Sequence, residues 1–276
     1  MTEHLAWPFF EPRHRELATK LEKWCGEKLG VEHPEDVDAA CRSLVPELGD
    51  AGFLKLCVAD GDKRPDVRSL AIARETLARH SGLADFAFAM QGLGSGSISL
   101  SGNDEQKRRW LPKVASGDAI AAFAMTEPEC GSDAASIAMT ARRDGDAWVL
   151  DGEKTYISNG GIADFYVTFA RSGEHGVRGL SAFLVPVDAP GLSVAERIEV
   201  IAPHPLARLK YEGVRGELIG AEGDGFGIAM RTLNLFRVTV GAAALGFARR
   251  ALDEALAFAS WRKLGGGTLA DNAVTQ

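Results

Sequence analysis

The chain has 276 residues, of which 46% are hydrophobic and 25% charged, the proportions of an ordinary globular protein with a sizeable core. Its formal net charge of −7, with no run of five like charges, argues against nucleic-acid binding. No apolar run reaches transmembrane length and no metal-ligand cluster stands out, so we expect neither membrane insertion nor a metal site. Four cysteines without CxxC spacing predict reduced thiols in a cytoplasmic protein: Cys25, Cys41, Cys57 and Cys130.

Residues 1–118 carry the periodicity of amphipathic helices and are predicted to form an all-α domain. Leu17, Leu21 and Trp24 share one face of the first helix. The last helix, beginning at Asp104, is expected to end at Pro112. Two further helices are predicted between them, over Ser69–His80 and Phe86–Leu100.

Residues 119–221 change to short apolar segments separated by turn signals, which predicts a β domain. The first strand runs from Ala119 to Met125. The Asp151-Gly152 pair is interpreted as the tight turn of a hairpin, because such pairs supply the positive φ that the turn needs. Asn159-Gly160-Gly161 marks another turn. Further strands are predicted over Phe165–Ala170, Ser181–Val187, Leu192–Val194 and Leu206–Tyr211.

Residues 222–276 return to helix, with one long alanine-rich segment from Asp224 to Lys263. A helix of this length with few breakers is typical of a helical bundle. The predicted fold class is therefore α+β: an N-terminal helical domain, a central antiparallel β-barrel or sandwich, and the start of a C-terminal helical bundle.

Two polar stretches in the β domain carry the chemistry. In the first, Ala124 to Asp133, the Gly131-Ser132 pair lies in a small-residue loop whose amides and hydroxyl can hold an anionic group. In the second, Asp151 to Gly161, Tyr156 offers an aromatic face and Ser158 a hydroxyl. Taken alone, each stretch is also typical of an ordinary strand that ends in a turn.

Together, in this order and at this spacing, the two stretches resemble the flavin-binding core of the acyl-CoA dehydrogenases, and the resemblance extends from near residue 10 to the end of the chain. It implies FAD as the cofactor. A motif near the end implies that Arg262 reaches the FAD of a neighbouring subunit, although Gly265 replaces the expected aromatic residue there. The remaining implied FAD contacts are Phe123, Met125, Thr126, Gly131, Ser132, Tyr156 and Ser158.

The resemblance also implies a reaction. A base removes the α-proton of an acyl-CoA thioester while a hydride leaves the β-carbon for flavin N5, which gives the 2-enoyl-CoA. Electrons then pass to an electron-transfer flavoprotein. Most relatives carry the basic glutamate beyond the position that matches Gln276, and Phe236 occupies the alternative position for it. The implied substrate-binding residues are Met90, Gln91, Asn234 and Arg237.

Three alternatives stay open. One is a flavin oxidase relative, in which oxygen reoxidises the flavin. Another is a non-catalytic or partner-dependent flavin-binding subunit, motivated by the missing base. The third, a helical interaction module, leaves the two polar stretches unexplained. The resemblance also implies a homo-oligomer, either a dimer or a dimer of dimers, acting in fatty acid or carboxylic acid catabolism.

Overall fold

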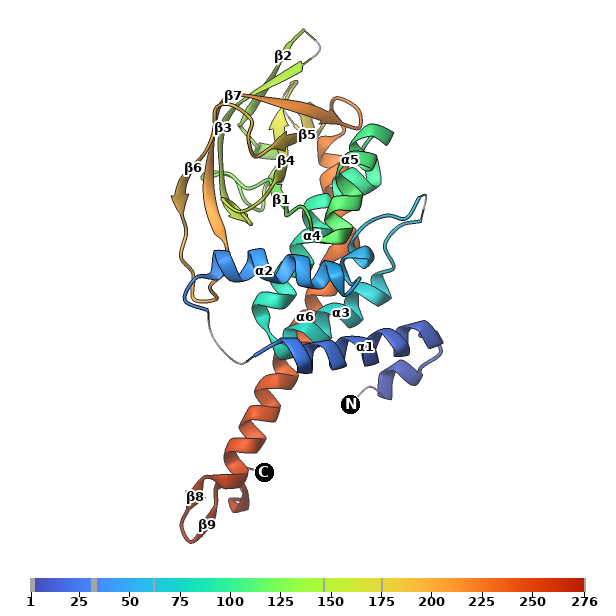
Figure 1. Ribbon diagram of the computed structural model, residues 1–276. Helices are drawn as coiled ribbons and strands as arrows, with labels where there is room; N and C mark the ends of the chain where they lie inside the picture. The colour runs from blue at the N-terminus through green and yellow to red at the C-terminus, as the bar shows by residue number, and fades with distance from the viewer. Residues whose placement is uncertain (1–2, 31–33, 62, 146, 175, 276) are drawn as a thin grey trace.

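The computed structural model describes residues 3–30, 34–61, 63–145, 147–174 and 176–275, and it shows helices, then a sheet, then a long helix. This order confirms the predicted α+β class (Figure 1). The helices are α1 Pro12–Lys28, α2 Val37–Asp50, α3 Val67–His80, α4 Gly82–Ser101, α5 Asp104–Ser116 and α6 Gly225–Trp261. The strands are β1 Ala121–Ala124, β2 Thr140–Asp144, β3 Ala147–Ser158, β4 Phe165–Arg171, β5 Leu180–Pro186, β6 Leu192–Arg197, β7 Leu206–Ile219, β8 Lys263–Leu264 and β9 Gly267–Thr268.

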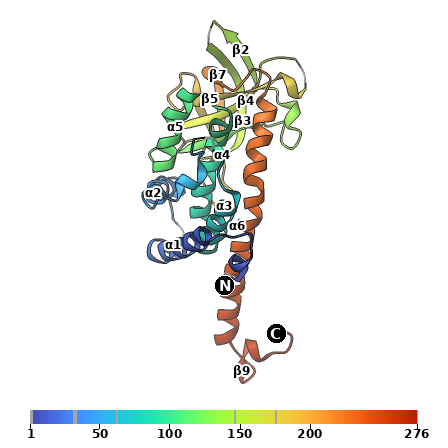
Figure 2. The same cartoon turned by 90° about the vertical axis from the view of Figure 1, so that its right-hand side faces the viewer.

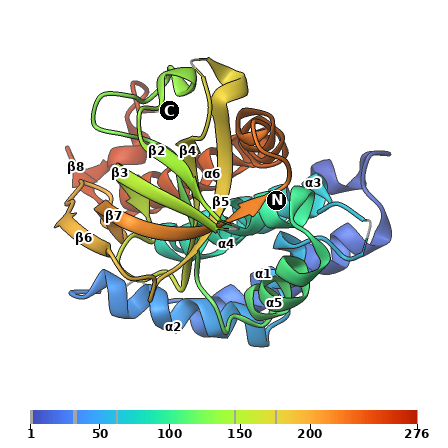
Figure 3. The same cartoon turned by 90° about the horizontal axis from the view of Figure 1, so that it is seen from above.

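Helix α4 lies at the centre of the molecule, with α2 and α6 on opposite sides of it (Figure 3). Its small residues allow close approach to the sheet: a Cβ on Gly94 would lie 2.7 Å from the backbone of Ala121 in β1. The Gln91 side chain fixes the same contact, since its amide donates to the Ala119 carbonyl and its oxygen accepts from the Ala121 amide, both at 2.8 Å. Helix α4 is therefore the support on which β1 rests.

Helix α5 continues past the proline that was expected to end it. Pro112 lies inside the helix, which ends only before Gly117, a residue with a φ of 83°. The prediction is wrong because the buried side chains of Leu111 and Val114 hold the last turns against the core, and this packing outweighs the hydrogen bond that proline cannot make. Gly117 supplies the left-handed conformation with which helices commonly end.

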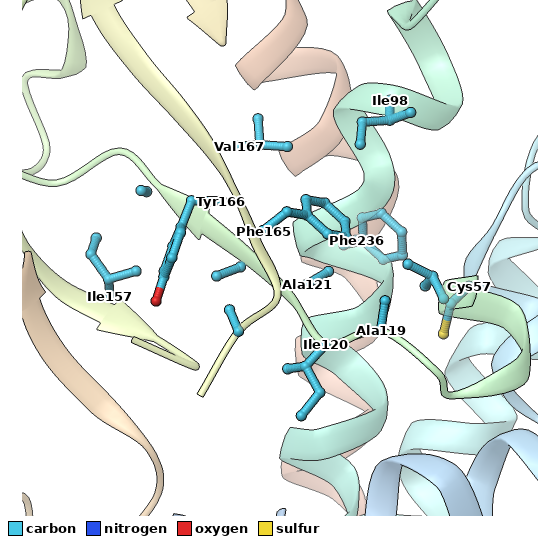
Figure 4. Packing of buried hydrophobic residues seen from close by; sticks show 14 of the residues in the cluster. Cys57, Ile98, Ala119, Ile120, Ala121, Ile157, Phe165, Tyr166, Val167 and Phe236 are labelled. Carbon is cyan, nitrogen blue, oxygen red and sulfur yellow. The ribbon is translucent and has the colours of Figure 1, made fainter. Parts of the chain in front are cut away.

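The strands form a closed sheet in the order β1-β4-β2-β3-β7-β5, with β4 also pairing β5 and β6 pairing β7. Most pairs are antiparallel, but β1 and β4 pair in parallel, with Ala121 opposite Phe165. The inner face of β1 and β4 joins the helices in one apolar cluster (Figure 4). Phe165 from β4 and Ile98 from α4 both belong to this cluster.

The predicted hairpin at Asp151-Gly152 is wrong. Strand β3 runs without a turn from Ala147 to Ser158, and Gly152 lies where the register to β7 shifts. Its φ of 146° serves this bulge, and a Cβ there would lie 2.8 Å from the Met139 side chain. The glycine is therefore needed for a close contact inside the sheet.

Helix α6 packs against α3 and α4 along its first part and then projects away from the body (Figures 1 and 2). It contains an 18-residue window that is long and apolar enough, by length and composition alone, to cross a membrane, with a mean hydropathy of 1.2. Only 33% of that window is buried. The large exposed apolar residues of the whole helix α6 are Val238, Val240, Leu245, Phe247, Leu252, Leu256, Phe258 and Trp261.

Candidate functional site

The two polar stretches meet at a cleft between the sheet and the helices. This central cleft has a volume of about 460 Å³. Its walls come from α4, from the segment after β1, from the end of β3 and from α6. The residues that line it are Met90, Leu93, Phe123, Met125, Thr126, Gly131, Ser132, Ala134, Tyr156, Ile157, Ser158, Met230, Leu233 and Arg237.

The first stretch reaches the cleft through a tight turn. Glu127 and Cys130 form a two-residue antiparallel bridge, in which the Glu127 amide donates to the Cys130 carbonyl at 2.9 Å and the reverse bond measures 3.2 Å. The Cys130 thiol donates to the Asp133 carbonyl at 2.8 Å. This turn directs the exposed Gly131 and Ser132 towards the cleft, where their amides are accessible to a bound anion.

The second stretch reaches the cleft through a bulge. The β3–β7 register shifts between Lys154 and Ile157, and Tyr156 inside this shift has a φ of 54°. A left-handed backbone is unfavourable for a residue with a side chain, and such conformations gather at functional sites. Tyr156 is 62% exposed, whereas its neighbours Thr155 and Ile157 are buried. The bulge therefore places an aromatic ring on the wall of the cleft.

Two contacts between the stretches were not anticipated from the sequence. The Thr155 amide donates to the Thr126 carbonyl at 2.9 Å. Beside it, the Lys154 ammonium lies 2.8 Å from Glu127 Oε1 and donates to the Met125 carbonyl at 3.0 Å, fully buried. Burial lowers the pKa of Lys154 to about 8, and the carboxylate of Glu127 opposes this shift. The signal in the sequence was weak: a glutamate just after the apolar strand β1 and a lysine within β3.

The turn after Ser158 is held from both domains. Asn159 has a φ of 60° and donates from its side chain to the Ala121 carbonyl at 2.9 Å. From α2, Arg42 donates to the carbonyls of Gly161 and Ile162, both at 3.2 Å. Because Asn tolerates the left-handed region better than most residues, this position suits it. These bonds fix the end of β3 against β1 and α2.

The helical walls of the cleft follow helical spacing. Met90 and Leu93 lie three residues apart on α4, and Met230, Leu233 and Arg237 recur at intervals of three and four on α6. Leu93 and Leu233 were not predicted as site residues. The same periodicity, continued from Met90 and Arg237, would have found both of them.

Three predicted residues do not line the cleft. Gln91 is fully buried under β1, where both ends of its amide are bonded to backbone. Asn234 is exposed on α6. Arg262 caps the far end of α6, 25 residues beyond Arg237, which corresponds to about 37 Å along a helix. Within one chain Arg262 cannot reach the cleft, so its predicted role requires a neighbouring subunit.

Phe236 also points away from the cleft. Its ring is 7% exposed and lies on α4, where a Cβ added to Gly92 would meet it at 2.5 Å and one added to Gly96 would meet it at 3.0 Å. The described residues that line the cleft include no aspartate, glutamate or histidine. Among the described residues, the cleft therefore has no carboxylate or imidazole that could act as a base on a bound substrate.

The residues of the cleft suit a flavin. The exposed face of Tyr156 and the apolar side chains of Met90 and Leu93 can contact a planar ring, while the hydroxyl-bearing Thr126, Ser132 and Ser158 supply hydrogen bonds around it. Largely apolar walls with a few placed polar groups are typical of cofactor sites.

Three family models cover nearly the whole chain: the acyl-CoA dehydrogenase N-terminal domain at residues 11–118, the middle domain at 122–214 and the C-terminal domain at 223–276. An acyl-CoA dehydrogenase of Bacillus subtilis is 36% identical over 251 residues, 88% of this chain and 66% of the relative. The chain belongs to the acyl-CoA dehydrogenase family. The resemblance found in the sequence is thereby confirmed.

Solved structures of the family agree with this assignment. An acyl-CoA dehydrogenase from Geobacillus kaustophilus gives a TM-score of 0.87 at 28% identity, covering 97% of this chain and 74% of the other. An acyl-CoA dehydrogenase complexed with FAD from Bacillus anthracis gives 0.87 at 31% identity, covering 96% of this chain and 47% of the other. The chain spans slightly less than two thirds of the Bacillus subtilis relative.

Proposed function

We propose that this chain forms the flavin-binding part of an FAD-dependent acyl-CoA dehydrogenase, which converts an acyl-CoA thioester to the 2-enoyl-CoA. The observation that supports the proposal is the meeting of Thr126, Ser132, Tyr156 and Ser158 at one cleft, although they come from two separate stretches of the sequence. Membership of the family and the FAD complex of a structural relative support the cofactor.

When bound, FAD supplies the acceptor for the hydride that leaves the β-carbon. The chain's own residues would bind FAD and orient it. Ser132 and the amides of its turn hold the anionic diphosphate, and Tyr156 presents its ring to the isoalloxazine. The hydroxyl of Ser158 fixes the edge of that ring, while Met90 and Leu93 exclude water from the reacting carbons.

A second cavity supports an acyl substrate. It has a volume of about 600 Å³ and shares Met90 with the central cleft. Phe86, Ala89 and Phe247 are among the residues that line it, so an acyl chain entering past Met90 would meet apolar side chains there. The same cavity is also lined by ionisable side chains, namely Arg74, Arg79, His80, Asp85, His204 and Arg250. Arg237 on α6 can contact the phosphates or adenine of CoA, for which a guanidinium is well suited.

The base is proposed to come from outside residues 1–276. No carboxylate among the described residues lines the central cleft, and Phe236 packs on α4 instead of facing it. A base must be within hydrogen-bond reach of the proton that it removes. Electron transfer to an electron-transfer flavoprotein, a homo-oligomeric assembly and a cytoplasmic location remain part of the proposal, the last supported by four free, buried cysteines.

The test is an anaerobic titration of the FAD-loaded chain with saturated acyl-CoAs of increasing chain length, followed by flavin absorbance. We expect a spectral shift that saturates at one acyl-CoA per flavin, little reduction, and weaker binding in Arg237→Gln. A chain whose spectrum responds to no acyl-CoA would refute the substrate class. Rapid bleaching would instead refute the external base.

That no carboxylate among the described residues lines the cleft also favours a second candidate, a non-catalytic flavin-binding subunit of the same family. Adding the downstream C-terminal helices of a family member in trans distinguishes the two. Restored reduction supports an enzyme whose base is external, and its failure supports a non-catalytic subunit. Photoreduction followed by air tests the oxidase alternative, because an oxidase would reoxidise rapidly with product bound.

A further inference from the structure

A continuous set of bonds leads from the buried Lys154 to both sides of the central cleft. Lys154 bonds the Glu127 carboxylate and the Met125 carbonyl. The backbone of Glu127 forms the turn that precedes Gly131 and Ser132. On the other side, Lys154 lies in β3 immediately before the bulge that carries Tyr156.

Glu127 holds a third segment. One of its carboxylate oxygens accepts from the Ala138 amide at 2.7 Å, and the other accepts from the Met139 amide at 3.0 Å as well as from Lys154. The loop between Cys130 and β2 is thereby tied at both of its ends to Glu127, at Cys130 to its backbone and at Ala138 and Met139 to its carboxylate. This loop contains Ser132, so the position of Ser132 depends on Glu127 although the two side chains have no hydrogen bond between them.

We propose that the buried Glu127–Lys154 pair is a positioning device for the cofactor, which holds the Ser132 turn and the Tyr156 bulge at the separation that FAD requires. Neither side chain lines the central cleft, so the pair acts through the residues that it holds. The inference rests on the proposed function, because it presupposes that FAD binds there.

The burial of the pair explains why it can set a geometry. The Lys154 side chain is 0% exposed and that of Glu127 is 7% exposed, so neither charge can turn towards water. Removing one partner leaves the other charge buried and uncompensated, and the surrounding segments must move to solvate it. Those segments are the two walls of the cleft, which is where the movement would be felt.

The charged state of the pair gives the inference a pH signature. Lys154 faces two titratable groups, Glu127 and the thiol of Cys130, whose pKa burial raises. As pH rises through the pKa of Lys154, near 8, its ammonium becomes neutral and the ionic part of the tether is lost. The Kd for FAD should therefore rise with pH in the wild-type chain and stay level where Lys154 is absent.

The experiment compares Lys154→Met, Glu127→Gln and the double variant with the wild-type chain, using FAD fluorescence to measure Kd. Lys210→Met is the matched control, since Lys210 pairs with Glu212 at 2.8 Å on the neighbouring strand β7 but is not buried. We expect a Kd at least about tenfold higher in each single variant and an unchanged Kd in the control. The fold-increase in Kd of the double variant should be smaller than the product of the fold-increases of the two single variants.

Amide exchange of the FAD-free chain gives an independent readout. The amides of Ala138 and Met139 should exchange at least about tenfold faster in Glu127→Gln/Lys154→Met than in the wild type, while amides in β4 keep their protection. A wild-type Kd in Lys154→Met and in the double variant would overturn the inference. It would also be overturned if the losses of binding free energy in the two single variants summed to the loss in the double variant. If the wild-type chain binds no FAD, that result refutes the proposed function, and the amide exchange of the FAD-free chain still tests whether the pair holds these segments.

Discussion

Replacing Tyr156 by glycine should separate cofactor binding from stability. A non-glycine residue at a φ of 54° is strained by about 1 kcal/mol, which glycine relieves. Glycine in turn adds about 0.5–1 kcal/mol of chain entropy to the unfolded state. Because the ring is 62% exposed, little burial is lost. The free energy of unfolding should therefore change by less than about 1 kcal/mol.

The effect on FAD should be larger. An aromatic contact contributes about 0.5–1.5 kcal/mol beyond the area that it buries, so losing the ring of Tyr156 should weaken FAD binding by about 1.5–2 kcal/mol. That corresponds to a Kd roughly ten- to thirtyfold higher. Tyr156→Phe keeps both the ring and the backbone strain, and it should bind FAD like the wild type.

The measurements are a urea titration for stability and quenching of FAD fluorescence for Kd. Retained affinity in Tyr156→Gly would show that the ring does not face the cofactor. An equal loss of affinity in Tyr156→Phe would assign the effect to the hydroxyl. A gain of more than about 1 kcal/mol in stability would show that the left-handed backbone is more strained than assumed here.

Two further predictions concern the support around the cleft. Gly92→Ala should destabilise the chain, because the added Cβ would lie 2.5 Å from the Phe236 ring. Gly241→Ala is the control: its Cβ would meet no atom within 4 Å, so it should stabilise α6 by about 0.5–1 kcal/mol. Urea midpoints that shift in the same direction in both variants would contradict this. Asp85→Asn should lower the free energy of unfolding by about 3 kcal/mol, because it leaves Arg74, now bonded at 2.7 and 2.8 Å and only 13% exposed, without its counter-charge. Arg74→Met/Asp85→Leu should lose much less, and a larger loss in that double variant would refute the argument.

The succession of a helical region, a β region and a long helix could be predicted from the sequence because each region is long and strongly patterned, but neither α2 nor β2 was predicted. Where a prediction was wrong, tertiary contacts determined the local structure. Gly152 has the composition of a hairpin turn, but its positive φ serves a bulge beside Met139. Pro112 is a helix stop by composition, yet packing of the neighbouring side chains carries α5 on to Gly117. Neither contact is visible from local sequence.

In the candidate site, too, some residues could be predicted from the sequence and others could not. Residues within the two polar stretches, such as Ser132 and Tyr156, line the cleft. Their place there could be predicted because the resemblance covers those positions directly. The pair formed by Glu127 and Lys154 was missed, because 27 residues separate them and a buried ion pair has no periodicity. Gln91 looked like a substrate contact, but its amide matches the backbone of β1 so well that it is buried there.

The central claim is that two strand ends of the β domain form a flavin site, and an FAD titration of the purified 276-residue chain tests it most directly. We predict that flavin fluorescence is quenched until one FAD is bound per chain, and that Tyr156→Gly shifts this curve to higher FAD concentration. Flavin fluorescence that is unchanged at every ratio of FAD to chain would contradict the claim.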